Sequence, residues 1–176
     1  MLEIARQLSI HKPDIGVDFL FTDLEDYGQP DDSPLPKMEN SWCLGTQYWC
    51  RSPHVPGYRA QFGILLDMVG AKGALFPKEG TGMYYAPDVQ EKVWNIAREA
   101  GFGQYFVNTE MHNTTDDHLY VNQLLQIPCI DIVHMRPDTR SYGAYHHTQD
   151  DNLDIIDPTV LRAVGQTVLE VLYREL

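Results

Sequence analysis

Gly16-Val-Asp-Phe-Leu-Phe-Thr22 is the stretch that decides the fold, because it is a continuous apolar run of the length of one strand. Such runs suit a strand in a parallel sheet that is covered on both faces. Residues 63–69 and 128–133 form two similar runs, and residues 74–76 predict a short continuation of the first of these two. The sequence therefore predicts a mostly parallel sheet.

Amphipathic patterns around these runs indicate helices. Apolar residues at positions 1, 2, 4, 5 and 8 predict one helix, and Pro87 or Asp88 opens another that reaches about Ala100. A third begins at Pro158 and runs through Tyr173, and short helices are expected near 42–51 and 116–123. The proline-containing segment 27–41 is expected to be a long irregular loop. Alternating strands and helices predict one α/β domain, an α/β/α sandwich.

Composition excludes several classes of partner. The length of 176 residues suits one domain with a full core, and 43% apolar with 22% charged residues is typical of a globular protein. No run approaches the length of a transmembrane helix. The net charge of −12 argues against nucleic acid and against an anionic membrane surface as partners.

Carboxylates accompany all three predicted strands, mostly at or just beyond their ends. Glu25 and Asp26 follow the first, Asp67 lies near the end of the second, and Asp131 lies within the third. In open α/β sheets, ligands sit beyond the carboxyl ends of the strands, so we expect these acids to lie close together. A lone aspartate could equally cap a turn. The adjacent acids repel each other, however, and such a pair suits one metal ligand and one free acid/base.

The loop Ala144-Tyr-His-His-Thr-Gln-Asp-Asp-Asn-Leu153 adds two histidines and two further carboxylates just before the last helix. Imidazole is a common metal ligand, and a carboxylate can hold its ring in the ligating tautomer. The alternative is a solvated polar loop. Together with the strand-end acids, the loop favours a metal site, with Asp26 and His147 as two ligands. His118 is predicted to lie on a helix surface, and Cys129 to be a small buried residue.

Five motifs in this order resemble those of the glutaminyl cyclases, especially the bacterial ones, within the wider zinc aminopeptidase superfamily. The resemblance extends from Met1 to about Leu172 and implies the zinc-exopeptidase (phosphorylase/hydrolase-like) α/β/α fold. The motifs are Phe19-Leu-Phe-Thr-Asp-Leu-Glu-Asp-Tyr-Gly28, Ile64-Leu-Leu-Asp-Met-Val-Gly-Ala71, Thr115-Asp-Asp-His118, Ile127-Pro-Cys-Ile-Asp-Ile132 and His147-Thr-Gln-Asp-Asp-Asn152.

The resemblance implies roles for individual residues. Glu25 corresponds to the general acid/base, and Asp26 and His147 correspond to zinc ligands. Asp67 corresponds to the acid that binds a second metal in aminopeptidases and supports the zinc site in cyclases. Asp116 corresponds to the carboxylate that relays a proton in cyclases.

Three positions are expected around the substrate pocket. Asp131 stands where animal cyclases carry a histidine that supports the metal site, and Trp42 aligns with a wall of the pocket. His146 stands where cyclases usually carry tryptophan beside the ligand histidine. Asp26 is a further departure, because many relatives have glutamate there.

The family carries another aspartate zinc ligand before its first helix, whereas this chain starts inside that helix. We therefore expect a C-terminal portion of a family member that lacks the leading strands, holds zinc weakly and has little activity alone. Its exposed sheet edge should favour a homo-oligomer. If a signal peptide lies upstream, the resemblance implies a periplasmic or secreted protein.

The function implied first is zinc-dependent cyclisation of N-terminal glutamine to pyroglutamate, with peptide N-termini as substrates and ammonia as the second product. A zinc aminopeptidase that hydrolyses N-terminal residues is the rival interpretation. A non-enzymatic binding or assembly module with an incomplete metal site is the third.

Overall fold

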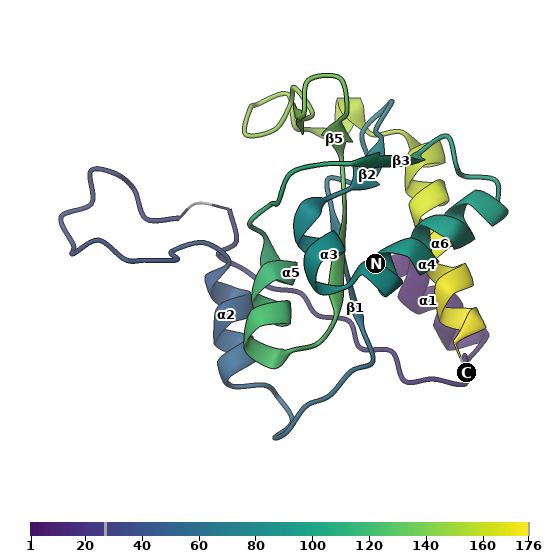
Figure 1. The fold of residues 1–176 in the computed structure, drawn as a ribbon, viewed down its shortest axis with the longest axis horizontal. Helices are drawn as coiled ribbons and strands as arrows, with labels where there is room; N and C mark the ends of the chain where they lie inside the picture. Colours follow the sequence, from purple (N-terminus) through teal and green to yellow (C-terminus); the bar gives the residue numbers. More distant parts are fainter. Residues whose placement is uncertain (27, 176) are drawn as a thin grey trace.

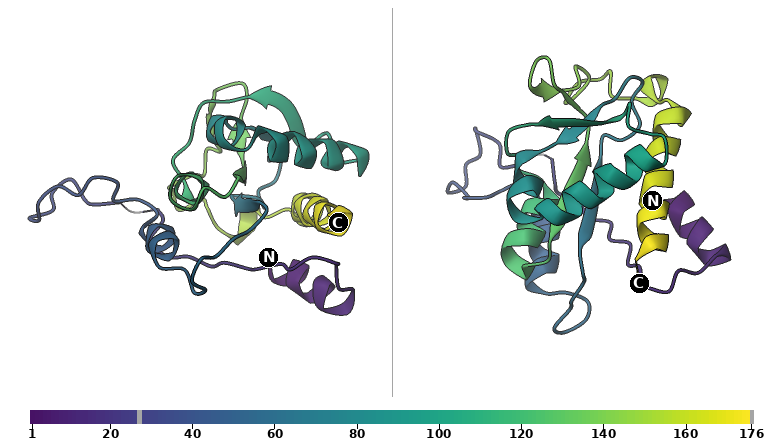
Figure 2. Two further views of the ribbon diagram at one scale, coloured as in Figure 1. Left: turned by 60° about the horizontal axis from the view of Figure 1, so that its bottom comes forward. Right: turned by 45° about the vertical axis from the view of Figure 1, so that its right-hand side comes forward.

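The computed structural model describes residues 1–26 and 28–175 (Figures 1 and 2). Parallel strand pairs alternate with helices, which confirms the α/β class. In chain order the helices and strands are α1 (Leu2–Ile10), α2 (Leu44–Arg51), β1 (Gly63–Asp67), β2 (Phe76–Lys78), α3 (Gly80–Tyr85), α4 (Pro87–Glu99), β3 (Phe106–Glu110), α5 (Asp117–Tyr120), the π-helix η1 (Val121–Leu125), β4 (Cys129–Val133), β5 (Met135–Arg136), β6 (Ser141–Tyr142), the 3-10 helix η2 (Leu153–Ile155) and α6 (Pro158–Arg174).

The central ladder joins β1 to β4 in parallel, from Gly63 opposite Cys129 to Asp67 opposite Val133. A second parallel pair joins β2 to β3, and the short pair β5–β6 is antiparallel. The mostly parallel arrangement is as predicted. Because β1 and β4 run in the same direction, their carboxyl ends meet at one edge, where the candidate site lies.

Helices cover this framework from the side seen at the right of Figure 1, where α4 packs against α6 and α1 lies along α6. The core includes Ile130 and Ile132 of β4, both fully buried, and the aromatic group of Phe76, Trp94 and Phe106. Burying an isoleucine side chain contributes about 1.5–3 kcal/mol. The core therefore fixes β4 and, through its ladder, the carboxyl end of β1.

The prediction that residues 16–22 form a hydrogen-bonded strand is wrong. Residues 16–22 are not part of a strand, and none of their backbone groups makes a backbone hydrogen bond to a residue that the structure describes. Val17 and Phe19 still pack on the core, so the apolar pattern was interpreted correctly as a core-facing segment. A strand also requires a neighbouring strand, and β1 pairs only with β4 within the described residues.

Two other expectations change. Residues 74–76 do not continue β1, because β2 starts at Phe76 and pairs with β3. The expected helix over 116–123 is a short α-helix followed by a π-helix.

The predicted loop is irregular over residues 28–41 and extends away from the body of the molecule in Figure 1. Tyr27, its first residue, lies outside the described residues.

No helix in the part of the chain that the structure describes is both long and apolar enough to cross a membrane. Apolar side chains are nevertheless exposed beside the unpaired segment, where Phe21 is 66% and Tyr48 is 73% exposed. These two residues line a shallow groove of about 620 Å³ between the segment and α2. Unpaired backbone next to apolar surface favours association with another chain.

We expect this surface to support the homo-oligomer predicted from the sequence. Phe21→Glu should weaken self-association about tenfold or more, because it places a charge in an apolar contact. Analytical ultracentrifugation over a concentration series measures the effect. Tyr84→Glu, which alters an exposed aromatic residue outside the groove, is the control. A parent chain that stays monomeric throughout the series would contradict the expectation.

Candidate metal centre and acid–base pair

The acid pair is held against the beginning of α2. The amide of Cys43 donates to the Glu25 carbonyl at 3.0 Å, and the amide of Gly45 donates to the Asp23 carbonyl at 3.1 Å. A side chain at Gly45 would not fit, because its Cβ would lie 2.4 Å from the Asp23 carbonyl oxygen. The glycine thus permits the close approach that places Glu25 and Asp26 above α2.

We expect Gly45→Ala to destabilise the protein by about 1–3 kcal/mol, because a methyl group would push two backbones apart. Urea unfolding measures the change. Gly165→Ala serves as the matched control, since the Cβ it adds meets no atom within 4 Å. If Gly45→Ala unfolds at the parent urea concentration, the close approach does not constrain the acid pair.

Left-handed backbone conformations surround the site. Leu24 (φ 52°) precedes Glu25, Met68 (φ 52°) follows Asp67, and Cys43 (φ 54°) and His147 (φ 58°) are themselves left-handed. This region costs free energy for side chains other than glycine, on the order of 1 kcal/mol or more per residue. Such residues cluster at functional sites, where the surrounding structure enforces them. Their distribution independently supports a functional site here.

Asp26 and His147 converge, as the sequence predicted. The Nε2 atom of His147 lies 2.5 Å from Oδ1 of Asp26, although 121 positions separate the two residues. The side chain of Asp26 is 53% exposed and that of His147 is 47% exposed, so a metal ion from solvent can reach them. Nitrogen and oxygen donors suit zinc, but tetrahedral coordination separates two donor atoms by about 3.3 Å. The pair therefore fits zinc by ligand type and would have to open slightly to admit the ion.

The histidine pair forms an aromatic stack. The ring centroids of His146 and His147 lie 3.7 Å apart, and the Tyr142 ring also stacks with His146, at a centroid distance of 4.4 Å. Partial burial, together with the neighbouring His147, lowers the pKa of His146. A flat neutral ring therefore stands beside the candidate ligand, at the position where the resemblance led us to expect tryptophan.

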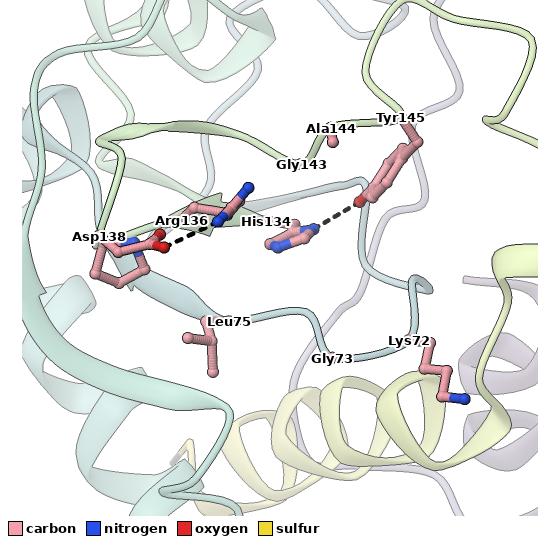
Figure 3. Close-up of a pocket in the computed structure, with 10 residues that line it drawn as sticks. Lys72, Gly73, Leu75, His134, Arg136, Asp138, Gly143, Ala144 and Tyr145 are labelled. Atoms are coloured by element: carbon pink, nitrogen blue, oxygen red, sulfur yellow. Dashed lines mark hydrogen bonds and ion pairs between the residues drawn. The ribbon is translucent and has the colours of Figure 1, made fainter.

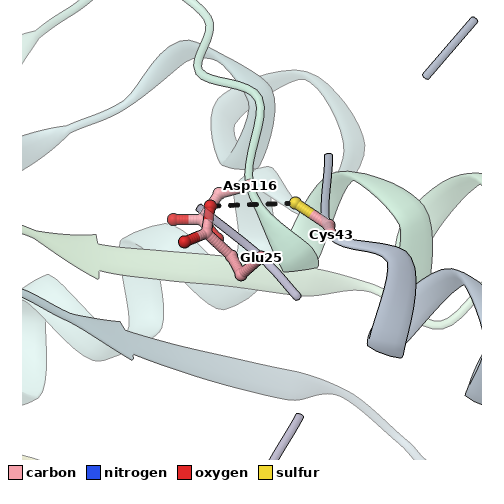
Figure 4. Close-up of side chains that lie close together, drawn as sticks. All are labelled: Glu25, Cys43 and Asp116. Carbon is pink, nitrogen blue, oxygen red and sulfur yellow. Dashed lines mark hydrogen bonds between the residues drawn. The ribbon is translucent and has the colours of Figure 1, made fainter. Parts of the chain in front are cut away.

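Glu25, Cys43 and Asp116 form a second cluster (Figure 4). Each offers one possible ligand atom, and these atoms all lie within 4.8 Å of one another. The Cys43 thiol donates weakly to Oε1 of Glu25 at 3.9 Å. The sequence did not single out Cys43, since its partners lie 18 and 73 positions away. Within the described residues this is the only such group of three, and it includes neither Asp26 nor His147.

Burial and crowding make these acids hold protons near neutral pH. Burial, followed by the charges of Asp26 and Asp67, raises the pKa of Glu25 to about 7. Burial and the charge of Asp67 raise the pKa of Asp116 to about 8, and burial raises that of Asp67 to about 6. Carboxyl groups with such pKa values can both accept and donate protons at neutral pH, which general acid/base catalysis requires.

The remaining predicted residues occupy different depths. Trp42, which precedes Cys43 in the chain, is 41% exposed and lies against Gly28, and its role as a pocket wall stays a prediction. Asp131 is fully buried, and neither of its carboxylate oxygens has a hydrogen-bond partner among the residues that the structure describes. It therefore lies beneath the surface and cannot line a substrate pocket. Burial and the nearby Asp116 raise its pKa well above the ordinary value.

The prediction for His118 is wrong. Its side chain is fully buried, and its Nε2 atom lies 3.0 Å from the buried carboxylate of Glu79. The surface assignment failed because the partner lies 39 positions away on the capping residue of α3. Cys129, by contrast, is buried as expected.

The loop that carries the histidines is tied to the end of β4. The Tyr145 hydroxyl lies 2.7 Å from Nδ1 of His134 (Figure 3). Gly143 permits this contact, because a Cβ there would lie 2.5 Å from the Tyr145 ring. The hollow in Figure 3 has a volume of about 520 Å³ and lies beside the candidate site without including Glu25, Asp26 or His147. We therefore assign the chemistry to the clustered side chains.

The α/β fold gathers carboxylates and a histidine at one sheet edge, an arrangement that suits a metal-dependent hydrolytic site. The chain belongs to peptidase family M28, whose model matches residues 1–172. No curated protein matches it.

Several solved structures are similar to the chain. A glutaminyl cyclase of Bacteroides thetaiotaomicron bound to N-acetylhistamine is 49% identical, with a TM-score of 0.93 over 99% of this chain and 60% of that one. A Zn-dependent exopeptidase of Parabacteroides distasonis is 48% identical, with a TM-score of 0.93 and the same coverage. A leucine aminopeptidase precursor of B. thetaiotaomicron is 48% identical, with a TM-score of 0.91 over 99% and 59%. The chain thus spans about 60% of the length of these relatives.

Proposed function

We propose that this site converts N-terminal glutamine of peptides to pyroglutamate with release of ammonia. The observation that carries the proposal is the placement of two proton-holding acids, Glu25 and Asp116, within 4.8 Å of each other next to the Asp26–His147 pair. The similarity to glutaminyl cyclases supports it.

In this reaction the α-amine nitrogen forms a bond to the γ-amide carbon of the same residue, and the carbon–nitrogen bond to the departing amide breaks. Glu25 takes one proton from the amine and passes it to the leaving nitrogen, which departs as ammonia. A pKa of about 7 lets one carboxyl group perform both transfers. Asp116 offers a carboxylate oxygen within 4.8 Å of Glu25, and we assign it the role of relaying a proton during ring closure.

Zinc is the cofactor implied for family members, and Asp26 and His147 are the residues of this chain that would hold it. When bound, zinc supplies Lewis-acid polarisation of the amide carbonyl. The two residues supply one nitrogen and one oxygen donor, and catalytic zinc commonly has three protein ligands. Zinc affinity and turnover of this chain are therefore expected to be low.

Product analysis tests the proposal. The chain, in molar excess over a peptide that begins with glutamine, is incubated with that peptide and zinc. The masses of the products are then measured by mass spectrometry. Cyclisation yields a peptide lighter by one ammonia, whereas an aminopeptidase shortens the peptide and frees an amino acid. We expect slow loss of ammonia above the rate in buffer. A shortened peptide as the sole product would replace the proposal with the rival function.

The aminopeptidase remains the second candidate for two reasons. Relatives of similar identity are named as an exopeptidase and an aminopeptidase precursor. His146 also departs from the tryptophan expected beside the ligand histidine of a cyclase. In that function Glu25 would activate water for hydrolysis of the peptide bond. A non-enzymatic module would leave the glutamine peptide unchanged at every zinc concentration.

A further inference from the structure

Glu79 occupies an unusual position for an acidic residue. Its side chain is completely buried, yet it precedes α3 and caps that helix by accepting hydrogen bonds from the amides of Thr81, at 2.8 Å, and Gly82. Burial opposes ionisation of this carboxyl group. The hydrogen bond and charge of His118, with the two amides, outweigh that effect and lower its pKa. A buried carboxylate with this many donors is strongly fixed in place.

The same carboxylate holds the chain on both sides of Asp116. The Thr114 hydroxyl, two residues before Asp116, donates to Oε2 of Glu79 at 2.9 Å. His118, two residues after Asp116, contacts Oε1 at 3.0 Å. Between these anchors, Oδ1 of Asp116 accepts a hydrogen bond from the Asp117 amide at 2.6 Å. The backbone and side chain of Asp116 are thereby held in one orientation.

A further contact strengthens the arrangement. The Thr81 hydroxyl donates to the Thr114 carbonyl at 2.8 Å, so α3 and the segment before α5 are joined at two neighbouring points. Asp116 itself faces Glu25 and Cys43. Glu79 is fully buried, and its hydrogen bonds to Thr114 and His118 connect it to the chain on both sides of Asp116.

We infer that Glu79 is a positioning residue. It holds Asp116 near Glu25 through its contacts with the residues two positions before and two positions after Asp116. The inference rests on the proposed function for its catalytic meaning, because Asp116 matters for turnover only if it acts in the reaction. The geometric part can be tested without turnover.

The test uses Glu79→Gln, which keeps the shape of the side chain but replaces one carboxylate oxygen with an NH₂ group. That group cannot accept the hydrogen bonds that the Thr81 and Gly82 amides and the Thr114 hydroxyl donate to the carboxylate. We expect the Asp117 amide, whose partner is Asp116, to exchange with deuterium about tenfold faster or more, and its proton resonance to move upfield. Exchange of the α6 amides of Val164 and Val168 should stay unchanged. Glu91→Gln, which alters an exposed carboxylate on α4 bonded to Lys78, should leave all of these amides as in the parent.

A second pair of variants keeps the inference falsifiable if Glu79→Gln fails to fold. Thr114→Val removes the hydrogen bond to Glu79 and should accelerate deuterium exchange of the Asp117 amide. Thr114→Ser retains the hydroxyl, so the Asp117 amide should exchange as slowly as in the parent. Unchanged Asp117 exchange in both Glu79→Gln and Thr114→Val would overturn the inference. Equal acceleration throughout α6 would also overturn it, since Glu79 would then support the fold in general.

Turnover provides the link to function. If the parent releases ammonia, Thr114→Val should lower kcat at least several-fold with KM little changed, and Thr114→Ser should recover kcat. If the parent releases none while Asp117 exchange responds as expected, the proposed function fails and the positioning role of Glu79 stands. If kcat is unaffected although Asp117 is released, the catalytic part of the inference is wrong.

Discussion

The free energy of unfolding should fall as the pH rises from about 4 to about 8, and Asp116→Asn should remove much of this fall. The folded-state pKa of Asp116 is about 8, compared with an ordinary value of 3.8. The folded protein therefore binds a proton that the unfolded chain has released, and stability decreases with pH across this interval. For a side chain as buried as Asp116, the effect is on the order of several kcal/mol.

The raised pKa values of Glu25 and Asp67 also make stability fall with rising pH, over narrower intervals that end at about pH 7 and pH 6 respectively. Glu79 acts oppositely, because its lowered pKa contributes stability that is lost as the pH falls through the folded value. Urea unfolding at pH 5 and pH 8 measures the slope. Asp31→Asn, at an exposed position in the irregular loop, is the control. An unchanged slope in Asp116→Asn would show that Asp116 does not hold a proton in the folded protein.

Glu25→Gln should lower the rate of ammonia release by about 10²–10⁴-fold, the usual contribution of a positioned general acid/base. The amide cannot accept the proton from the amine, although its size and position are retained. KM should change little, because the variant removes proton transfer and leaves the contacts that bind the peptide. Mass spectrometry under single-turnover conditions measures the rate.

Glu39→Gln is the matched control, since it makes the same substitution at an exposed position of the loop. Zinc affinity must be measured in parallel, because a loss of zinc would lower the rate for another reason. A variant that keeps more than half of the parent rate would exclude Glu25 as the group that transfers the proton.

The sequence predicted the acidic edge of the sheet and the partnership of Asp26 with His147 well. The first prediction rests on the general rule that parallel strands deliver their following residues to one edge. The second rests on the ligand chemistry of the histidine loop and on the resemblance, and it brings together two residues 121 positions apart although the segment before Asp26 is not a strand. The helices were predicted well where an apolar period and a terminal proline or glycine coincide, as in α4 and α6.

The failures have a common physical origin. Residues 16–22 have the composition of a strand, but strand formation depends on a neighbour that a local pattern does not specify. Helix α3 was missed because Gly80 and Gly82 disfavour a helix, and its capping acid, Glu79, is satisfied by distant donors. Burial of His118 and the approach of Cys43 to Glu25 likewise depend on long-range packing. One local signal was available, because an acid before a Gly-Thr-Gly run can cap a helix.

The left-handed residues beside the site could not be predicted either. Leu24 and Met68 carry side chains that ordinarily avoid this conformation. Their conformations are imposed by the contacts around the acids, such as the docking of Glu25 on the start of α2. Strain of this kind becomes visible only once the fold is known.

The central claim, that Asp26 and His147 are ligands of one metal ion, is tested most directly by titrating zinc into the chain labelled with ¹⁵N at its histidines. We predict that the Nε2 resonance of His147 shifts and saturates, and that Asp26→Ala weakens this binding about tenfold or more. The exposed His11 and His54 provide internal controls. Zinc binding that saturates while the His147 resonances stay in place would contradict the account.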